Sequence, residues 1–174
     1  DRMSELFQDK ENISIYDSCM GTSGWLVTAY NLLKKTFENI NLSGGEVEPE
    51  TFQYGVMNII NTLKEFPNDI ECNSSLTHIN NSKHTLICTN PPFNSKNKIK
   101  FEQIEKNLKK DEYTKKNKIN IDKLYILKKD DPPIQFLELD LFKLEKNGMC
   151  IIVLPYGEFF SGKSFKNTRE HFMN

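Results

Sequence analysis

The sequence has little that would connect it to disulfides, to a metal or to a membrane. Its four cysteines include no CxxC pair and stand next to or within apolar runs, as buried thiols of a reducing compartment do. They are Cys19, Cys72, Cys88 and Cys150. No apolar run approaches the roughly 18 residues that span a bilayer, and no signal-peptide pattern opens the chain. We therefore expect a soluble, intracellular and cytoplasmic protein with no metal site and no membrane contact.

Size and charge indicate one domain with an unusual insertion. A length of 174 residues, with 37% hydrophobic and 27% charged residues, suits a globular chain of one domain. Since the chain starts at Asp1 and ends inside an expected helix, we expect an incomplete piece of a longer protein. Residues 94–130 hold 12 Lys against 6 Asp plus Glu, a net charge of +6, so the rest of a chain of charge −1 carries −7. This Lys-rich insertion is either a solvated, partly disordered segment or a surface for nucleic-acid phosphates.

Short apolar runs alternate with longer amphipathic stretches, which is typical of a parallel sheet with crossover helices. The expected strands cover residues 13–17, 40–47, 70–72, 85–89 and 149–154. The expected helices cover residues 25–33, 49–63, 134–144 and 164–173, and Gly148 is expected to make the turn before the last strand. The fold class is therefore α/β, with a mainly parallel, doubly wound sheet.

Two features at strand ends predict a nucleoside cofactor, because ligands of open α/β sheets bind beyond the carboxyl ends of the strands. Asp17 ends the first strand, and the turn from Gly21 to Gly24 lets a ligand approach the backbone before the next helix. Glu46 follows the second strand, where a carboxylate can accept hydrogen bonds from both ribose hydroxyls. The alternative for Glu46 is an ordinary surface carboxylate near a helix N-terminus.

The tetrapeptide Asn90-Pro91-Pro92-Phe93 follows the fourth expected strand. Consecutive prolines fix φ and remove N–H donors, so the carbonyl groups of Asn90 and Pro91 can be held outward as acceptors. The Asn90 amide oxygen and the Pro91 carbonyl can then bind both hydrogens of a planar amino group and stabilise the positive charge that develops as its nitrogen attacks a methyl donor. Phe93 would stack on the ring that carries the amino group. The alternative is a tight turn without chemistry.

With these motifs the chain resembles the N6-adenine-specific DNA methyltransferases, especially the modification subunit of type I restriction-modification systems. The resemblance rests on residues 17–26, 44–51, 90–93 and 147–157, the last containing Leu-Pro-x-Gly. It implies a Rossmann-like methyltransferase fold and S-adenosylmethionine as cofactor. By this resemblance Asp17, Gly21, Thr22 and Gly24 hold the amino-acid part of the cofactor, Glu46 holds its ribose, Val47 packs against its adenine, and Asn90, Pro91, Pro92 and Phe93 hold the target base. It further implies DNA as substrate, and a specificity subunit and a restriction subunit as partners.

The chain departs from the family pattern in five places, one of which is Thr85, where the family usually has an acid before the apolar run. Ser18 replaces the usual proline, and Ser23 replaces a glycine of the turn. The family often has an acidic residue after its third strand that contacts the cofactor's adenine, whereas this chain reads Asn73-Ser74-Ser75-Leu76. Ser74 or Asn73 would have to substitute for the acid. The Lys-rich insertion has no counterpart in the family pattern.

Other functions remain open at this stage. The same turn serves enzymes that methylate protein glutamine or an amino group of an RNA base, and a non-catalytic binding scaffold is a further alternative. Residues 157–164 formally match the phosphate-binding pattern G-x-x-x-x-G-K-[ST], which would indicate a nucleotide triphosphatase. The adjacent Phe159 and Phe160 do not suit a loop that wraps phosphates. For His78, His84 and His171 we expect ordinary surface roles.

Overall fold

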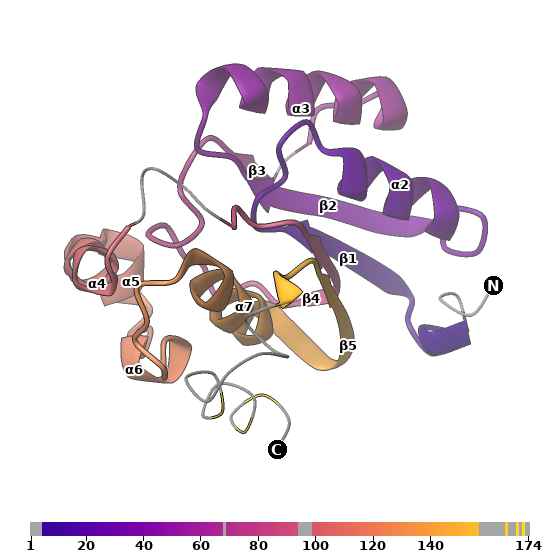
Figure 1. Ribbon diagram of the computed structural model, residues 1–174. Helices are drawn as coiled ribbons and strands as arrows, with labels where there is room; N and C mark the ends of the chain where they lie inside the picture. The colour runs from indigo at the N-terminus through magenta and orange to yellow at the C-terminus, as the bar shows by residue number, and fades with distance from the viewer. Residues whose placement is uncertain are drawn as a thin grey trace.

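The computed structural model describes residues 5–67, 69–93 and 99–156, together with residues 166, 170 and 172. Over these residues the chain forms a parallel sheet of five strands in the order β3-β2-β1-β4-β5 (Figure 1). The strands are β1 (Asn12–Asp17), β2 (Asn39–Gly45), β3 (Asp69–Glu71), β4 (His84–Thr89) and β5 (Leu144–Ile152). The predicted α/β class with a parallel, doubly wound sheet is confirmed.

Helices cover both faces of this sheet (Figure 1). Two of them, α2 (Gly24–Leu33) and α3 (Pro49–Leu63), lie on one face, and α7 (Pro132–Lys143) lies on the other. The main core is formed between the sheet and α2 and α3 by fully buried side chains such as Ile15, Leu26, Leu33, Ile59 and Leu86. The apolar residues that recur at helical spacing in α2 and α3 are therefore on the helix faces that pack against the sheet. No helix of the described residues is long and apolar enough to cross a membrane.

The strand order reverses between β1 and β4. β1 pairs with β2 on one side and with β4 on the other, so the chain winds outward in one direction through β3 and in the opposite direction through β5. The carboxyl ends of β1 and β4, at Asp17 and Thr89, lie at this reversal. In open α/β sheets such a reversal leaves a crevice where ligands bind.

The described part of the Lys-rich insertion is helical, so a disordered insertion is the wrong interpretation for these residues. It forms α4 (Phe101–Lys110), α5 (Glu112–Lys116) and α6 (Ile121–Leu124). On α4 the buried residues Ile104 and Leu108 stand one turn apart and pack in a second core with Tyr125 and Leu139. The two ends of the insertion are joined, because the Phe101 amide donates to Asp130 Oδ1 over 2.7 Å. A few apolar residues at helical spacing thus suffice to fold this segment.

Two further expectations change at the level of single residues. Gly148 lies inside β5 rather than before it, because β5 starts at Leu144 and residues 145–148 stand opposite Thr85 at an irregularity of the pairing. Cys72 is exposed rather than buried. The phosphate-binding pattern at residues 157–164, His171 and most of the expected last helix lie outside the described residues.

Candidate functional site

A cavity of about 500 Å³ opens at the carboxyl edge of the sheet, at the reversal between β1 and β4. Its wall includes six of the residues predicted from the sequence: Gly21, Glu46, Val47, Ser74, Asn90 and Pro92. They come from the loops that follow β1, β2, β3 and β4. The cofactor residues and the Asn-Pro-Pro-Phe turn, which are far apart in sequence, therefore share one cavity.

Glu46 joins the loops that follow β1 and β2. Its Oε2 accepts a hydrogen bond from the Gly21 amide over 3.1 Å, and its Oε1 accepts from the Glu48 amide over 2.8 Å. Gly21 has a φ of +51°, in the left-handed region that favours glycine. Each carboxylate oxygen keeps a second lone pair for a ligand. Glu46 therefore has a structural role in this turn in addition to facing the cavity.

Asp17 is placed at the expected end of β1 but does not line the cavity. Its side chain is fully buried, and its Oδ1 accepts from the Cys19 amide over 3.0 Å. Burial raises the pKa of this carboxyl to about 7, and the nearby charge of Glu46 adds to the rise. Asp17 therefore stabilises the turn through its hydrogen bond with the Cys19 amide. A direct contact between Asp17 and the amino-acid part of a cofactor stays a prediction.

Thr22 and Gly24 also stand outside the cavity wall. The Thr22 carbonyl accepts a hydrogen bond of 2.9 Å from the Asn58 side chain of α3, so this part of the turn is held by the helix behind it. Ser23, which replaces the family's glycine, takes a left-handed φ of 66° and is fully buried. A non-glycine residue in this conformation costs about 1 kcal/mol, which the packing of the turn has to offset.

The Asn90-Pro91-Pro92-Phe93 turn presents two of its residues to the cavity. Asn90 and Pro92 line it, whereas Pro91 is buried and Phe93, 40% exposed, stands outside the wall. The turn is tied to the loop after β1, because Ser18 Oγ and Thr89 Oγ1 lie 3.1 Å apart in the interior. Ser18, a departure from the family's proline, thus supplies a hydrogen bond that proline cannot make.

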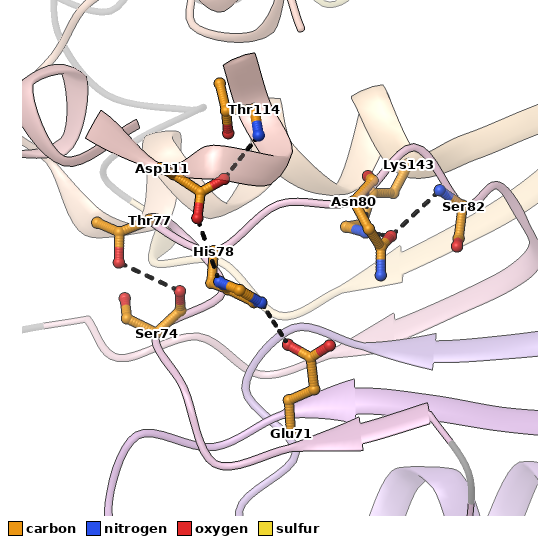
Figure 2. A network of polar contacts seen from close by, with 9 residues as sticks. All are labelled: Glu71, Ser74, Thr77, His78, Asn80, Ser82, Asp111, Thr114 and Lys143. Carbon is orange, nitrogen blue, oxygen red and sulfur yellow. Dashed lines mark hydrogen bonds and ion pairs between the residues drawn. The ribbon is translucent and has the colours of Figure 1, made fainter. Parts of the chain in front are cut away.

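The wall after β3 consists of residues 73–76, which a set of polar contacts holds in place (Figure 2). His78 lies between two carboxylates, with Nε2 3.4 Å from Glu71 Oε2 and Nδ1 3.6 Å from Asp111 Oδ1. The buried Tyr125 hydroxyl donates to the Leu76 carbonyl over 3.1 Å. His78 is exposed, as expected of a surface histidine, and it also links β3 to the insertion through contacts that its isolated place in the sequence did not indicate.

His84, for which a surface role was expected, is buried instead. It is 3% exposed, stacks on Tyr16 with ring centroids 4.6 Å apart, and has Nδ1 2.8 Å from Ser14 Oγ. Burial, together with the charges of Lys143 and Lys83, lowers the pKa of the His84 imidazole to about 3. The ring is thus neutral at physiological pH and belongs to the face of the sheet away from α2 and α3.

A further part of the cavity wall comes from Ile99, near the start of the insertion, and from α7, which follows its end, and the sequence analysis did not identify it. It consists of Ile99 before α4 and of Pro132, Gln135 and Phe136 in α7. Gln135 stands in a run of mostly apolar helical residues, so only its polarity could have marked it. The insertion therefore leaves the main fold at the rim of the cavity and returns there.

Comparisons with known proteins agree with this arrangement. The family model described as N-6 DNA methylase matches residues 1–174. A search of curated protein sequences gave no match. Among solved structures, a type I restriction-modification methyltransferase subunit from Streptococcus thermophilus has a TM-score of 0.67 at 19% identity, over 98% of this chain and 35% of that one. A chain from a study of complex assembly and conformational transition of the type I restriction-modification system has a TM-score of 0.71 at 20% identity, over 98% and 34%.

The TM-scores of 0.67 and 0.71 establish a shared fold. The chain spans about one third of the length of both structures. The family match covers every residue of the chain, including the four strand-end loops that form the cavity. The chain belongs to the N-6 DNA methylase family.

Proposed function

We propose that this chain is the cofactor-binding and catalytic core of an S-adenosylmethionine-dependent methyltransferase that modifies the N6 amino group of adenine in DNA. One observation carries the proposal: a single cavity joins Glu46 and Val47, the expected cofactor residues, to Asn90 and Pro92 of the turn expected to hold the base. Membership of the N-6 DNA methylase family supports adenine in DNA as the substrate.

The residues of the cavity fit such a cofactor. Gly21, whose positive φ favours glycine, has no side chain, so a ligand can approach the backbone on this wall. The Glu46 carboxylate offers free lone pairs to two ribose hydroxyls. Val47, 67% exposed, provides an uncovered apolar surface for a purine ring. When bound, the cofactor would supply a methyl group on a positively charged sulfonium sulfur, which is a good leaving group because it departs as a neutral thioether.

Asn90 and Pro91 perform the chemical step by holding acceptors in place. The Asn90 side-chain oxygen and the Pro91 carbonyl would take the two hydrogens of the target amino group and stabilise the positive charge that grows on its nitrogen. The nitrogen can lose its proton after the attack, so the site needs no strong base. The link between Ser18 and Thr89 keeps these acceptors in fixed relation to the loop after β1, which favours a productive alignment.

The target base has to leave the double helix to reach this cavity. Unstacking a base costs a few kcal/mol, and the enzyme offsets it by stacking the flipped base on an aromatic side chain. Phe93, which is 40% exposed and follows Pro92 of the cavity wall, is the residue that we expect to do so. The proposed reaction is therefore base flipping followed by direct methyl transfer, without a covalent enzyme intermediate.

We further propose that the full-length protein works in a type I restriction-modification system, with a specificity subunit and a restriction subunit as partners. The matching methyltransferase subunit belongs to such a system, and the other matching chain comes from a study of its assembly. A separate specificity subunit would supply the DNA sequence recognition. An enzyme of this kind would act in the cytoplasm, where its DNA substrate is found.

The test is methyl transfer from labelled cofactor by the full-length protein with its partner subunits. Unmethylated DNA, RNA and protein are offered in parallel, and we expect label on N6 of adenine in DNA alone. Label in protein glutamine or in RNA, with none in DNA, would show that the substrate is protein or RNA and contradict the proposal of DNA. Binding of the cofactor without transfer to any of the three would indicate a non-catalytic scaffold.

A further inference from the structure

Gln135 of α7 lies in the cavity wall with an orientation that its neighbours determine. Its side chain is 1% exposed, and its Nε2 donates two hydrogen bonds, of 3.1 Å to the Ile99 carbonyl and 2.8 Å to the Lys129 carbonyl. Carbonyl oxygens only accept, so an exchange of the amide oxygen and nitrogen would place oxygen against oxygen at both contacts. The amide nitrogen is therefore fully used, and the oxygen is fixed on the other side.

The Oε1 atom of Gln135 is buried and has no hydrogen-bond partner among the described residues. A buried acceptor without a donor costs about 1–3 kcal/mol, so folded proteins rarely leave one unsatisfied. Since this residue lines the cavity, a ligand there can supply the missing donor. Gln135 is held by two backbone carbonyls at the base of the insertion, so the acceptor is preorganised.

The surroundings of this acceptor are apolar and suit a flat ring. Leu76, Ile99, Pro132 and Phe136 line the same cavity, together with Val47 on the β2 side. The cavity also has polar lining residues, among them Glu46, Ser74 and Asn90. Beside apolar residues, a fixed acceptor favours an aromatic ring that carries an N–H donor, because an oxygen at that position would be repelled and left unpaired.

We propose that Gln135 Oε1 accepts a hydrogen bond from the exocyclic amino group of the cofactor's adenine, in place of the acidic residue that the sequence lacks after β3. The proposal rests on the proposed function. It assigns the purine to the part of the cavity that Val47 and Leu76 share with Gln135, next to the ribose contact of Glu46. Phe93, expected to stack on the target base, stands outside this wall, which separates the two purines.

The experiment measures dissociation constants by calorimetry for the full-length protein with its partner subunits. The two ligands are S-adenosylhomocysteine and its analogue with hydrogen in place of the purine amino group. We expect the wild type to bind the analogue about tenfold more weakly, as the loss of one hydrogen bond of about 1.4 kcal/mol requires. In Gln135→Met the two constants should become equal, whereas the exposed control Gln53→Met should keep the wild-type ratio.

The ratio of the two constants distinguishes recognition from a structural role. If Gln135 merely supports the insertion, Gln135→Met weakens both ligands by the same factor and the ratio stays, which overturns the proposal. A change confined to the KM for DNA would assign Oε1 to the target base and also overturn it. If Gln135→Met does not fold, Gln135→Asn is used instead. It keeps an amide, but its shorter side chain places the oxygen out of reach of the ligand, so the two dissociation constants should again become equal. A wild type that binds neither ligand would instead contradict the proposed function itself.

Discussion

Gly55 of α3 lies so close to Gly21 that a Cβ at position 55 would stand 2.6 Å from the Gly21 carbonyl oxygen. The same Cβ would stand 2.8 Å from Ser23 Oγ. The helix thus presses directly on the turn that lines the cavity. Any side chain at position 55 has to displace this turn.

We therefore predict that Gly55→Ala weakens cofactor binding about tenfold and lowers the free energy of unfolding by about 1–3 kcal/mol, the usual cost of overpacking. This loss exceeds the gain of about 1 kcal/mol from alanine's better helix propensity. The matched control is Gln53→Ala, at an exposed position of the same helix. Calorimetry with S-adenosylhomocysteine and chemical unfolding should show an effect for Gly55→Ala only. Equal behaviour of the two variants would mean that the turn yields without consequence.

The sequence predicted the scaffold well because the sheet signal is local. Buried parallel strands appear as continuous apolar runs, so β1 and β4 are predicted to within one residue of their observed bounds. The strand-end position of Asn90 followed directly from the run of β4, whereas β2 ends at Gly45, two residues before its expected end and directly before Glu46. The cavity position of these two residues was therefore within reach of the sequence.

The remaining site residues depend on tertiary contacts that no local pattern encodes. Asp17 stands at the predicted strand end, yet its side chain turns into its own loop to bind the Cys19 amide. Gln135 enters the cavity wall because α7 packs beside Ile99, 36 residues earlier in the chain, while its amide also binds the carbonyl of the nearby Lys129. By contrast, the helical spacing of Phe101, Ile104 and Leu108 is present in the sequence and could have predicted α4. The sequence analysis missed it because it considered only the many lysines of this segment.

Asn90 is expected to act on the reaction and not on cofactor binding. Replacement by alanine removes one of the two acceptors for the target amino group, and losing such a group typically costs a factor of about 100 to 1,000 in kcat. We predict that Asn90→Ala abolishes detectable methyl transfer, with a nearly unchanged dissociation constant for S-adenosylhomocysteine. Asn61→Ala on the exposed face of α3 serves as the control. If cofactor binding vanished along with transfer, the role assigned to Asn90 would be wrong.

Asp17 should make the stability of the fold depend on pH. Burial raises the pKa of its carboxyl from an ordinary 3.8 to about 7, so the folded protein holds this proton more tightly than the unfolded chain. The resulting stabilisation is fully present below pH 3.8 and is lost as the pH rises toward 7. Asp17→Asn keeps an oxygen for the Cys19 amide and removes the titration.

We predict that the unfolding free energy of the wild type, relative to Asp17→Asn, falls by up to about 4 kcal/mol between pH 4 and pH 7. Taking the difference between the two proteins cancels the contribution of buried carboxyls that do not interact with Asp17, such as Glu138, whose pKa burial also raises. Urea unfolding at both pH values measures it. A difference that stays constant with pH would show that Asp17 is not the titrating group.

The lysines of α4 distinguish a phosphate-binding insertion from a solvated one. Lys106, Lys109 and Lys110 lie on the exposed side of a helix whose other face is buried by Ile104 and Leu108. The insertion begins and ends at the rim of the cavity, because Ile99 and Pro132 both line it. DNA whose base enters the cavity would therefore bring its phosphates near this helix, where fixed cations bind them with release of counterions.

We predict that replacing these three lysines by glutamine weakens DNA binding and reduces the slope of log K against log salt by about 2–3, since each phosphate contact contributes about 0.9. Cofactor affinity should not change. The control replaces Lys35 and Lys64, which follow the C-terminal ends of α2 and α3 and so lie at the opposite edge of the parallel sheet. Salt slopes that are equal in wild type, triple variant and control would assign the insertion to solvation alone, because lysines that do not contact phosphate release no counterions from DNA.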